Sequence, residues 1–328
     1  MTLDHYAPCP CGNGKKIKFC KCIDQPQEYE KIVKLIEGEQ NLAAIDRINQ
    51  LLEKTPNTAW LLAIKGELTL GMQEFDSFIE TASRLHKLKP DNPLGMVMMA
   101  ISASIESKPA AEVGRYLLEG LSETRESVHP MTLMGIRMLI QAMSMEGLLC
   151  MVGFWSDVFG ALSGEQAEQD LPTNDPSINL LAKTPSKIID EAAGNDWSER
   201  LEEVISLTKT FRYAQAENKL RSILRDFPDQ PGPLSHLLRA QCALLDQQGA
   251  YETAMKLAEN LQISVAERAH FRAIAFEVEP DTESLQTGMR VEYCEVDSEE
   301  RIEDVMDGLD YVEAPESQSL EEVRRYYA

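Results

Sequence analysis

The feature that most constrains the fold is a helical pattern that repeats along the body of the chain. Between residues 28 and 92, apolar residues recur at intervals of three, four and seven positions, which places them on one face of a helix. Pro56 and Pro90 end two successive units of this pattern. We therefore predict paired amphipathic helices, with buried faces formed by Ala44, Ile45, Ile48, Leu51 and Leu52 and by Phe78, Ala82 and Leu85.

The helix–turn–helix units repeat about every 34 residues, a period that resembles the tetratricopeptide repeat (TPR). The resemblance implies an all-α fold, a helical-hairpin solenoid whose stacked pairs bury their faces against one another and form a concave binding surface. Gly66, in the first helix of the second unit, is expected to let neighbouring helices approach closely. Beyond Pro93 we expect the period to be lost, although the helical pattern continues to about residue 162.

The same pattern predicts a second helical array after a break. Residues 163–198 hold Gly, Pro, Asn and Asp in turn-forming clusters and are predicted to be a linker. From residue 199 to 277 the helical pattern resumes, with a final helix expected over 265–276. The apolar residues expected in this core are Ala216, Leu220, Ile223, Leu224, Leu234, Leu237, Leu238, Ala254, Leu257, Ala258 and Leu261.

Charge is unevenly distributed along the 328 residues. The whole chain has 54 acidic and 32 basic residues, a net charge of −22, which repels phosphate backbones. Residues 278–328 are predicted to be a partly disordered acidic tail, with a short strand over 289–296 and a helix over 298–309. Residues 1–24 are instead weakly basic, because four lysines face two aspartates. The predicted segments are therefore 1–24, 25–162, 163–198, 199–277 and 278–328.

Four of the seven cysteines lie in the short sequence CPCGNGKKIKFCKC, at Cys9, Cys11, Cys20 and Cys22. Two C-x-C pairs separated by a glycine-bearing turn can converge on one tetrahedral ion. A segment this short buries too little apolar surface to fold alone, so metal binding would supply its folding energy. Zn²⁺ suits four S/N ligands without redox chemistry, and a closed four-ligand site predicts a structural role.

The cysteines allow three other interpretations. A C-x-C disulfide closes a strained ring and is unfavourable in a reducing compartment. An iron–sulfur cluster is possible, but the spacing differs from the common ferredoxin patterns. Redox-active thiols are the third alternative.

The segment CPCGNGKKIKFC resembles the SEC-C motif, the zinc-binding tail of the protein-export motor SecA. The resemblance implies a zinc module that docks on protein partners, among them an export chaperone or the ribosome. The contact surface it implies consists of Lys15, Lys16, Lys18 and Lys21. The motif places its last ligand directly after the third cysteine, where this chain has Lys21, so we expect Cys22 to be the fourth ligand, with His5 as the second candidate.

No catalytic constellation is found in the sequence. The five histidines are scattered, and no phosphate-binding glycine loop or nucleophile elbow is present. Cys150 and Cys242 lie in apolar helical pattern and are expected to be core residues. Nine of the fourteen methionines lie between residues 96 and 151, and we expect them mainly to fill the core.

The longest uncharged apolar stretch, residues 93–105, is too short to span a bilayer, and the first residues are not a secretory signal. We therefore expect a cytoplasmic, non-enzymatic zinc-binding adaptor that binds protein or peptide partners. The alternative is a nucleic-acid-associated regulator that uses the basic zinc head, which the overall acidity disfavours.

Overall fold

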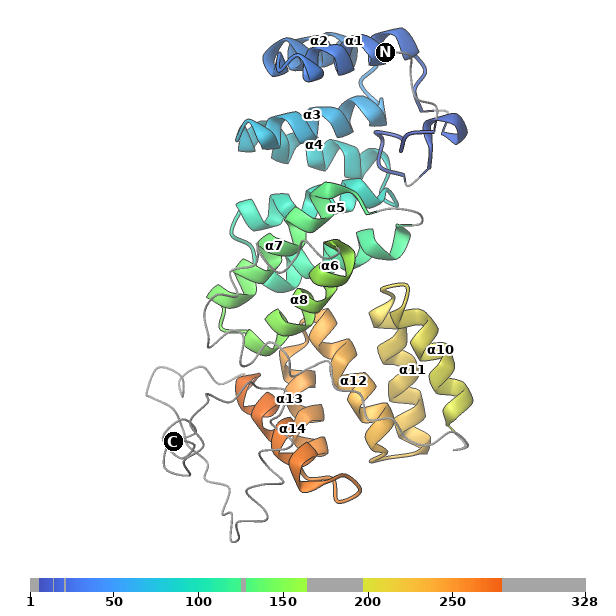
Figure 1. Cartoon of the computed structure of the whole chain (residues 1–328), viewed down its shortest axis with the longest axis vertical. Helices are drawn as coiled ribbons and strands as arrows, with labels where there is room; N and C mark the ends of the chain where they lie inside the picture. Colours follow the sequence, from blue (N-terminus) through green and yellow to red (C-terminus); the bar gives the residue numbers. More distant parts are fainter. Residues whose placement is uncertain (1–5, 14, 21, 125–127, 164–196, 279–328) are drawn as a thin grey trace. The chain divides into compact units, whose positions relative to one another are not determined.

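The computed structural model describes residues 6–13, 15–20, 22–124, 128–163 and 197–278 (Figure 1). These residues form thirteen α-helices and no strand, which confirms the predicted all-α fold for this part of the chain. The chain divides into two compact units, residues 1–142 and 143–328. Most of the predicted linker lies outside the described residues, as does the predicted acidic tail beyond residue 278, with its expected strand and helix.

The first unit consists of a short N-terminal segment followed by helices that pack on one another in sequence order (Figure 1). We call residues 6–24 the head; it contains one helical turn, the 3-10 helix η1 (Ile17–Phe19). The α-helices of this unit are α1 (Pro26–Glu37), α2 (Asn41–Lys54), α3 (Ala59–Gly71), α4 (Phe75–Leu88), α5 (Pro93–Ile105), α6 (Ala110–Glu123) and most of α7 (Pro130–Met145).

The described part of the second unit consists of one helix, α8, and five further helices that pack in sequence order. Here α8 packs against α12 and α14, and each of the helices from α10 to α14 packs against the next. The helices are α8 (Leu149–Ser163), α10 (Ser198–Thr208), α11 (Tyr213–Asp226), α12 (Pro231–Leu244), α13 (Gln247–Ala258) and α14 (Val265–Glu277).

The helix-pair period extends further than the sequence predicts. The first helices of successive pairs, α1, α3 and α5, begin at residues 26, 59 and 93, and the second helices begin at 41, 75 and 110. The expected loss of the period beyond Pro93 is therefore wrong, because α5 and α6 form a third pair in register with the first two. The second unit keeps nearly the same spacing, since α10 and α12 begin at 198 and 231, and α11 and α13 at 213 and 247.

A left-handed residue marks the turn inside each of these helix pairs. Glu39, Gln73 and Ser107 occupy equivalent positions in the first three pairs and have φ angles of 58°, 60° and 55°. Phe211 and Leu245 repeat the geometry with φ of 57°. In each turn the next amide donates to the carbonyl five positions earlier, at 2.8–3.0 Å. This Schellman geometry satisfies helix-end carbonyls and fixes the sharp reversal between paired helices.

The predicted apolar faces form the core. All eight residues predicted for α2 and α4 are buried, and Phe78, Ala82 and Leu85 are completely inaccessible. A Cβ atom at Gly66 would lie 2.1 Å from Met98 Cε, so the absence of a side chain at Gly66 leaves the space that the end of Met98 on α5 fills.

Most of the core predicted for the second array is also buried, with two exceptions. Leu224 on α11 is only half-buried. Leu261 differs more strongly from its prediction, because it lies beyond the end of α13 and is 84% exposed. The apolar pattern predicted that α13 continues to Leu261, but the helix ends at Ala258.

The isolated cysteines and the clustered methionines differ in how deeply the structure buries them. Cys150 and Cys242 are both fully buried, as predicted. Met134 and Met145 on α7, by contrast, are 43% and 82% exposed. Core filling therefore accounts for part of the methionine cluster; the buried members are Met98, Met131, Met143 and Met151.

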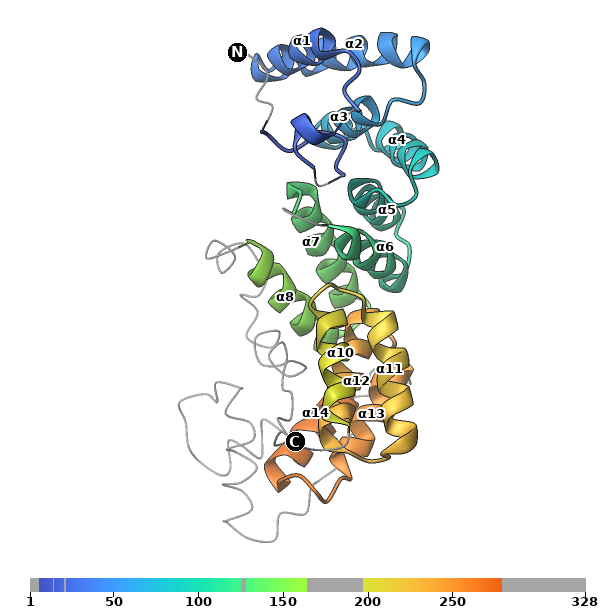
Figure 2. The same cartoon turned by 90° about the vertical axis from the view of Figure 1, so that its right-hand side faces the viewer.

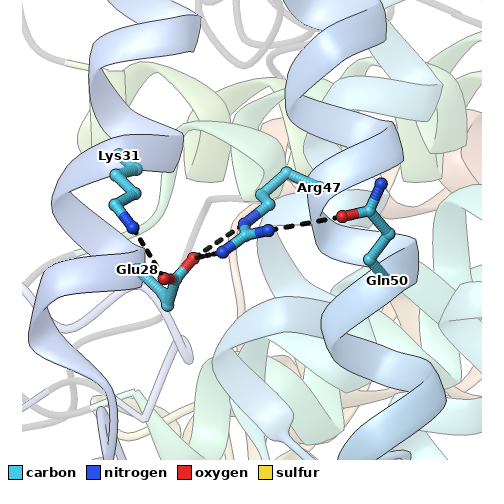
Figure 3. A network of polar contacts seen from close by, with 4 residues as sticks. All are labelled: Glu28, Lys31, Arg47 and Gln50. Atoms are coloured by element: carbon cyan, nitrogen blue, oxygen red, sulfur yellow. Dashed lines mark hydrogen bonds and ion pairs between the residues drawn. The ribbon is translucent and has the colours of Figure 1, made fainter.

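A charged network joins α1 to α2 in the first pair (Figure 3). Arg47 Nε donates to Glu28 Oε2 at 2.7 Å, and Lys31 Nζ donates to Glu28 Oε1 at 2.9 Å. Arg47 Nη1 also reaches Gln50 Oε1 at 3.3 Å. Lys31 and Arg47 lower the pKa of Glu28, because both cations favour its charged form.

Among the helices described in either unit, none has the length and apolar character needed to cross a membrane.

Replacing a left-handed turn residue by glycine should stabilise the protein. Gln73→Gly is expected to raise the free energy of unfolding by up to about 1 kcal/mol, because glycine adopts positive φ without a Cβ clash. Urea unfolding followed by circular dichroism measures the change. Gln73→Ala is the matched control and should give no gain; equal effects of the two variants would contradict the explanation.

Candidate metal centre

The four cysteines of the head converge on one point. The sulfur atoms of Cys9, Cys11, Cys20 and Cys22 all lie within 4.8 Å of one another. The Cys9 and Cys22 sulfurs are 3.0 Å apart, and the Cys11 and Cys20 sulfurs are 3.6 Å apart. All four are free thiols. A tetrahedral ion with metal–sulfur bonds of about 2.3 Å requires sulfur–sulfur distances of about 3.8 Å, so small shifts suffice to hold one.

A tight hairpin positions the first pair of cysteines. The amide of Cys9 donates to the Lys15 carbonyl at 2.7 Å, and the amide of Ile17 donates to the Ala7 carbonyl at 2.9 Å. Gly12 turns the chain with a φ of 71°, a conformation that glycine adopts without strain. The hairpin brings Cys9 and Cys11 to the inner side, where they are 4% and 0% exposed.

The second pair is positioned by the helical turn η1. Ile17 anchors this turn with a buried side chain. The amide of Cys20 donates to the carbonyls of Lys16 and Ile17, both at 3.1 Å. The turn directs the chain back toward the first pair, so Cys20 and Cys22 close the cluster.

Asn13 supports the cluster from outside it. Its Nδ2 donates to the Cys20 sulfur at 3.0 Å, and its Oδ1 accepts from the Lys15 amide at 3.0 Å. An N–H donor to a thiolate stabilises the negative charge of the ligand and orients it. Asn13 lies in the turn between the two cysteine pairs, and the sequence alone did not identify its hydrogen bond to Cys20.

The thiols shift one another's pKa values. The pKa of Cys11 is lowered because the Cys22 and Cys9 thiols donate hydrogen bonds to its thiolate. The pKa values of Cys22 and Cys9 are raised, mainly because each thiol is held as the donor to Cys11. A divalent cation must therefore displace protons from the cluster, and metal binding should weaken as the pH falls.

Three lysines of the head lie on its outer surface. Lys15, Lys16 and Lys18 are exposed, and Lys18 Nζ donates to the Tyr6 hydroxyl at 3.1 Å. Lys18 Nζ also lies 5.0 Å from the Tyr6 ring centre and 5.8 Å from that of Phe19. Tyr6 and Phe19 are 60% and 65% exposed. We call these five residues the outer patch; its aromatic members were not identified from the sequence.

Two residues of the sequence prediction are not described by the structure. Lys21, predicted to contact partners, and His5, the second candidate for the fourth ligand, lie outside the described residues. Their roles stay predictions. The convergence of Cys22 with the other three cysteines supports the preferred ligand set over one that uses His5.

The inner side of the head packs against the helices of the first unit (Figures 1 and 2). Asn92 Nδ2 donates to the Cys11 carbonyl at 2.8 Å, and Trp60 Nε1 donates to Asp24 Oδ1 at 3.4 Å. These contacts could not be predicted from the sequence, because no local pattern pairs residue 11 with residue 92.

No model of a protein family matches the chain, and no curated protein matches it. The SEC-C and tetratricopeptide resemblances therefore rest on the residues of the head and on the spacing of the helices.

Removing the fourth cysteine should weaken metal binding. Cys22→Ala is expected to lose zinc in competition with a chromogenic chelator, because three thiolates leave the ion with an open position. Lys21→Ala should retain the ion, since a protonated lysine is a poor ligand. His5→Ala should also retain it; zinc loss in His5→Ala with retention in Cys22→Ala would show that the fourth ligand lies upstream.

The hydrogen bond from Asn13 to the Cys20 sulfur leads to a separate prediction. Asn13→Asp keeps an oxygen for the Lys15 amide but removes the N–H donor to Cys20, so zinc affinity should fall by about 10-fold or more. Chelator competition at constant pH measures the change. Gln25→Glu is the control for added negative charge in the same region and should have a much smaller effect. An affinity unchanged by Asn13→Asp would show that the contact does not support the ligand.

Proposed function

We propose that this protein is a non-enzymatic, zinc-binding adaptor that binds protein or peptide partners. The observation that carries the proposal is the closed cluster of four thiols on the head of a helical-hairpin array. Four thiolates complete the coordination of Zn²⁺ and leave no position for a reactive water, so the ion would have a structural role. Cys9, Cys11, Cys20 and Cys22 would hold it.

The charges of the head support zinc as the bound ion. Four thiolates around Zn²⁺ carry a formal charge of about −2, which nearby cations stabilise. Lys15, Lys16 and Lys18 lie in the same short segment, together with Lys21. The lysines would therefore offset the charge of the centre as well as face partners. They leave little excess positive charge for a phosphate backbone, which disfavours the nucleic-acid alternative.

The outer patch is the proposed contact surface of the head. Exposed aromatic rings beside lysines provide apolar area and charge together, and aromatic residues are enriched at protein interfaces. The SEC-C resemblance makes an export chaperone or the ribosome the first partners to test. Stacked helical hairpins offer the second surface, as helical repeats commonly do. The proposed location is the cytoplasm, where reducing conditions keep such thiols free for metal.

Substitutions in the outer patch should reduce partner binding without releasing zinc. Phe19→Ala and Lys18→Glu are expected to lower the amount of partner captured by the immobilised protein by about 10-fold, the loss typical of a hot-spot residue. Native mass spectrometry confirms that each variant keeps its ion. Capture is compared by quantitative mass spectrometry.

Matched controls lie elsewhere on the first unit. Leu42→Ala removes an apolar side chain that is 65% exposed, and Lys54→Glu reverses an exposed lysine charge on α2. Neither should change capture. Binding of a single-stranded oligonucleotide with a steep salt dependence, abolished by Lys18→Glu, would instead support the nucleic-acid alternative.

A further inference from the structure

Asn92 connects the metal centre to the helical array. Its side chain is 3% exposed and lies directly before α5. Its Oδ1 accepts from the Gly95 amide at 2.8 Å, which caps the start of α5. Its Nδ2 donates to the carbonyl of Cys11, a member of the thiol cluster, at 2.8 Å. One buried side chain therefore satisfies both the end of a helix and the backbone of the cluster.

The contact beside Asn92 leaves no free space. A Cβ at Gly12 would lie within 3 Å of three side-chain atoms of Leu94, the nearest of them at 2.1 Å. Leu94 is itself buried. The hairpin of the head thus rests with its backbone directly on the first turn of α5. This contact forms only when the hairpin has its folded shape, since Gly12 must keep its φ of 71°.

The preceding helix pair contacts the head at the position equivalent to Leu94. Trp60 is the second residue of α3, as Leu94 is of α5, so the two residues hold matching places in successive pairs. Trp60 is buried, and its Nε1 donates to Asp24 at the end of the head. Tyr29 of α1 meets the Trp60 ring edge-on at 5.7 Å. The head and α1 therefore meet the starts of α3 and α5.

We propose that the metal centre has a second role, as a latch that holds the first three helix pairs together. Asn92 is the positioning residue that couples metal binding to the packing of these pairs. Metal binding gives the head the shape in which the Cys11 carbonyl and Gly12 meet α5. Without the ion, the Asn92 amide and the Trp60 indole would lose partners in a buried place, which is costly. The latch rests on the metal-binding part of the proposed function, and it requires no partner.

Coupling of this kind is reciprocal. If metal binding stabilises docking of the head on α3 and α5, then weakening the docking must weaken metal binding by the same factor. A purely structural cap on α5 would not change the affinity of the cysteines for an ion. Zinc affinity therefore distinguishes a latch from a helix cap.

Asn92→Asp tests the coupling in the full chain. Aspartate still caps α5 but cannot donate to the Cys11 carbonyl, so zinc affinity should fall by about 5-fold to 100-fold, the loss expected for one buried hydrogen bond. Asp246→Ala is the matched control, because Asp246 caps α13 in the other unit by accepting from the Gly249 amide at 3.0 Å. This control should leave zinc affinity unchanged.

Hydrogen exchange supplies the reverse measurement. Removing zinc from the wild-type protein with a chelator should speed amide exchange at the starts of α1, α3 and α5 and leave α10 to α13 unchanged. Should Asn92→Asp fail to fold by circular dichroism, Trp60→Phe takes its place, since phenylalanine keeps an apolar ring and loses the donor to Asp24. Its zinc affinity should also fall.

The outcomes separate the latch from the adaptor. Two results would overturn the latch alone. One is a zinc affinity of the folded Asn92→Asp variant equal to that of the wild type; the other is an amide exchange rate in α3 and α5 that does not change when the chelator is added. A wild-type chain that binds no zinc would overturn both proposals. Weaker zinc binding in the variant, together with faster exchange at α3 and α5 after chelation, would support the latch while leaving partner binding to its own test.

Discussion

The repulsion among four thiolates is the constraint on which the head of this protein depends. Four sulfur atoms within 4.8 Å of one another cannot all ionise without a cation between them. The Cys22 and Cys9 thiols lower the pKa of Cys11, and Asn13 donates to Cys20 from outside the cluster. A divalent ion would resolve the repulsion and fix a segment that has little apolar core of its own.

The helical array depends on a different local device. Each hairpin reverses at a left-handed residue whose next amide bonds back to the end of the preceding helix, as at Gln73 and Ser107. Because these turns recur at a constant spacing in the first three pairs, equivalent positions in those pairs fall in register. The head uses this register, since it contacts Trp60 and Leu94 at the same place in α3 and α5. The repeat therefore provides a regular surface on which a small module can rest.

The two sides of the head have separate chemistry. The inner side holds the Cys11 carbonyl against Asn92 and Gly12 against Leu94. The outer patch presents Lys18 beside Tyr6 and Phe19. Substitutions on one side can therefore be separated experimentally from those on the other. An adaptor built this way would keep its partner surface in shape through an ion that the partner never contacts.

Much of this arrangement follows from the sequence alone. The periodicity of apolar residues determined which faces of α2 and α4 are buried, because a helix of 3.6 residues per turn places them on one side. The spacing of the cysteines determined that they could converge, since glycine allows the tight turn between them. Other features were decided only by the tertiary structure. The register of the third helix pair was not predicted, because no proline lies two residues beyond α6 as Pro56 and Pro90 do beyond α2 and α4. That register is held by backbone turns that many side chains tolerate. The docking of Cys11 on Asn92 joins residues 81 positions apart. Only the folded chain brings them together, because the stacking of successive helix pairs sets where the head can rest.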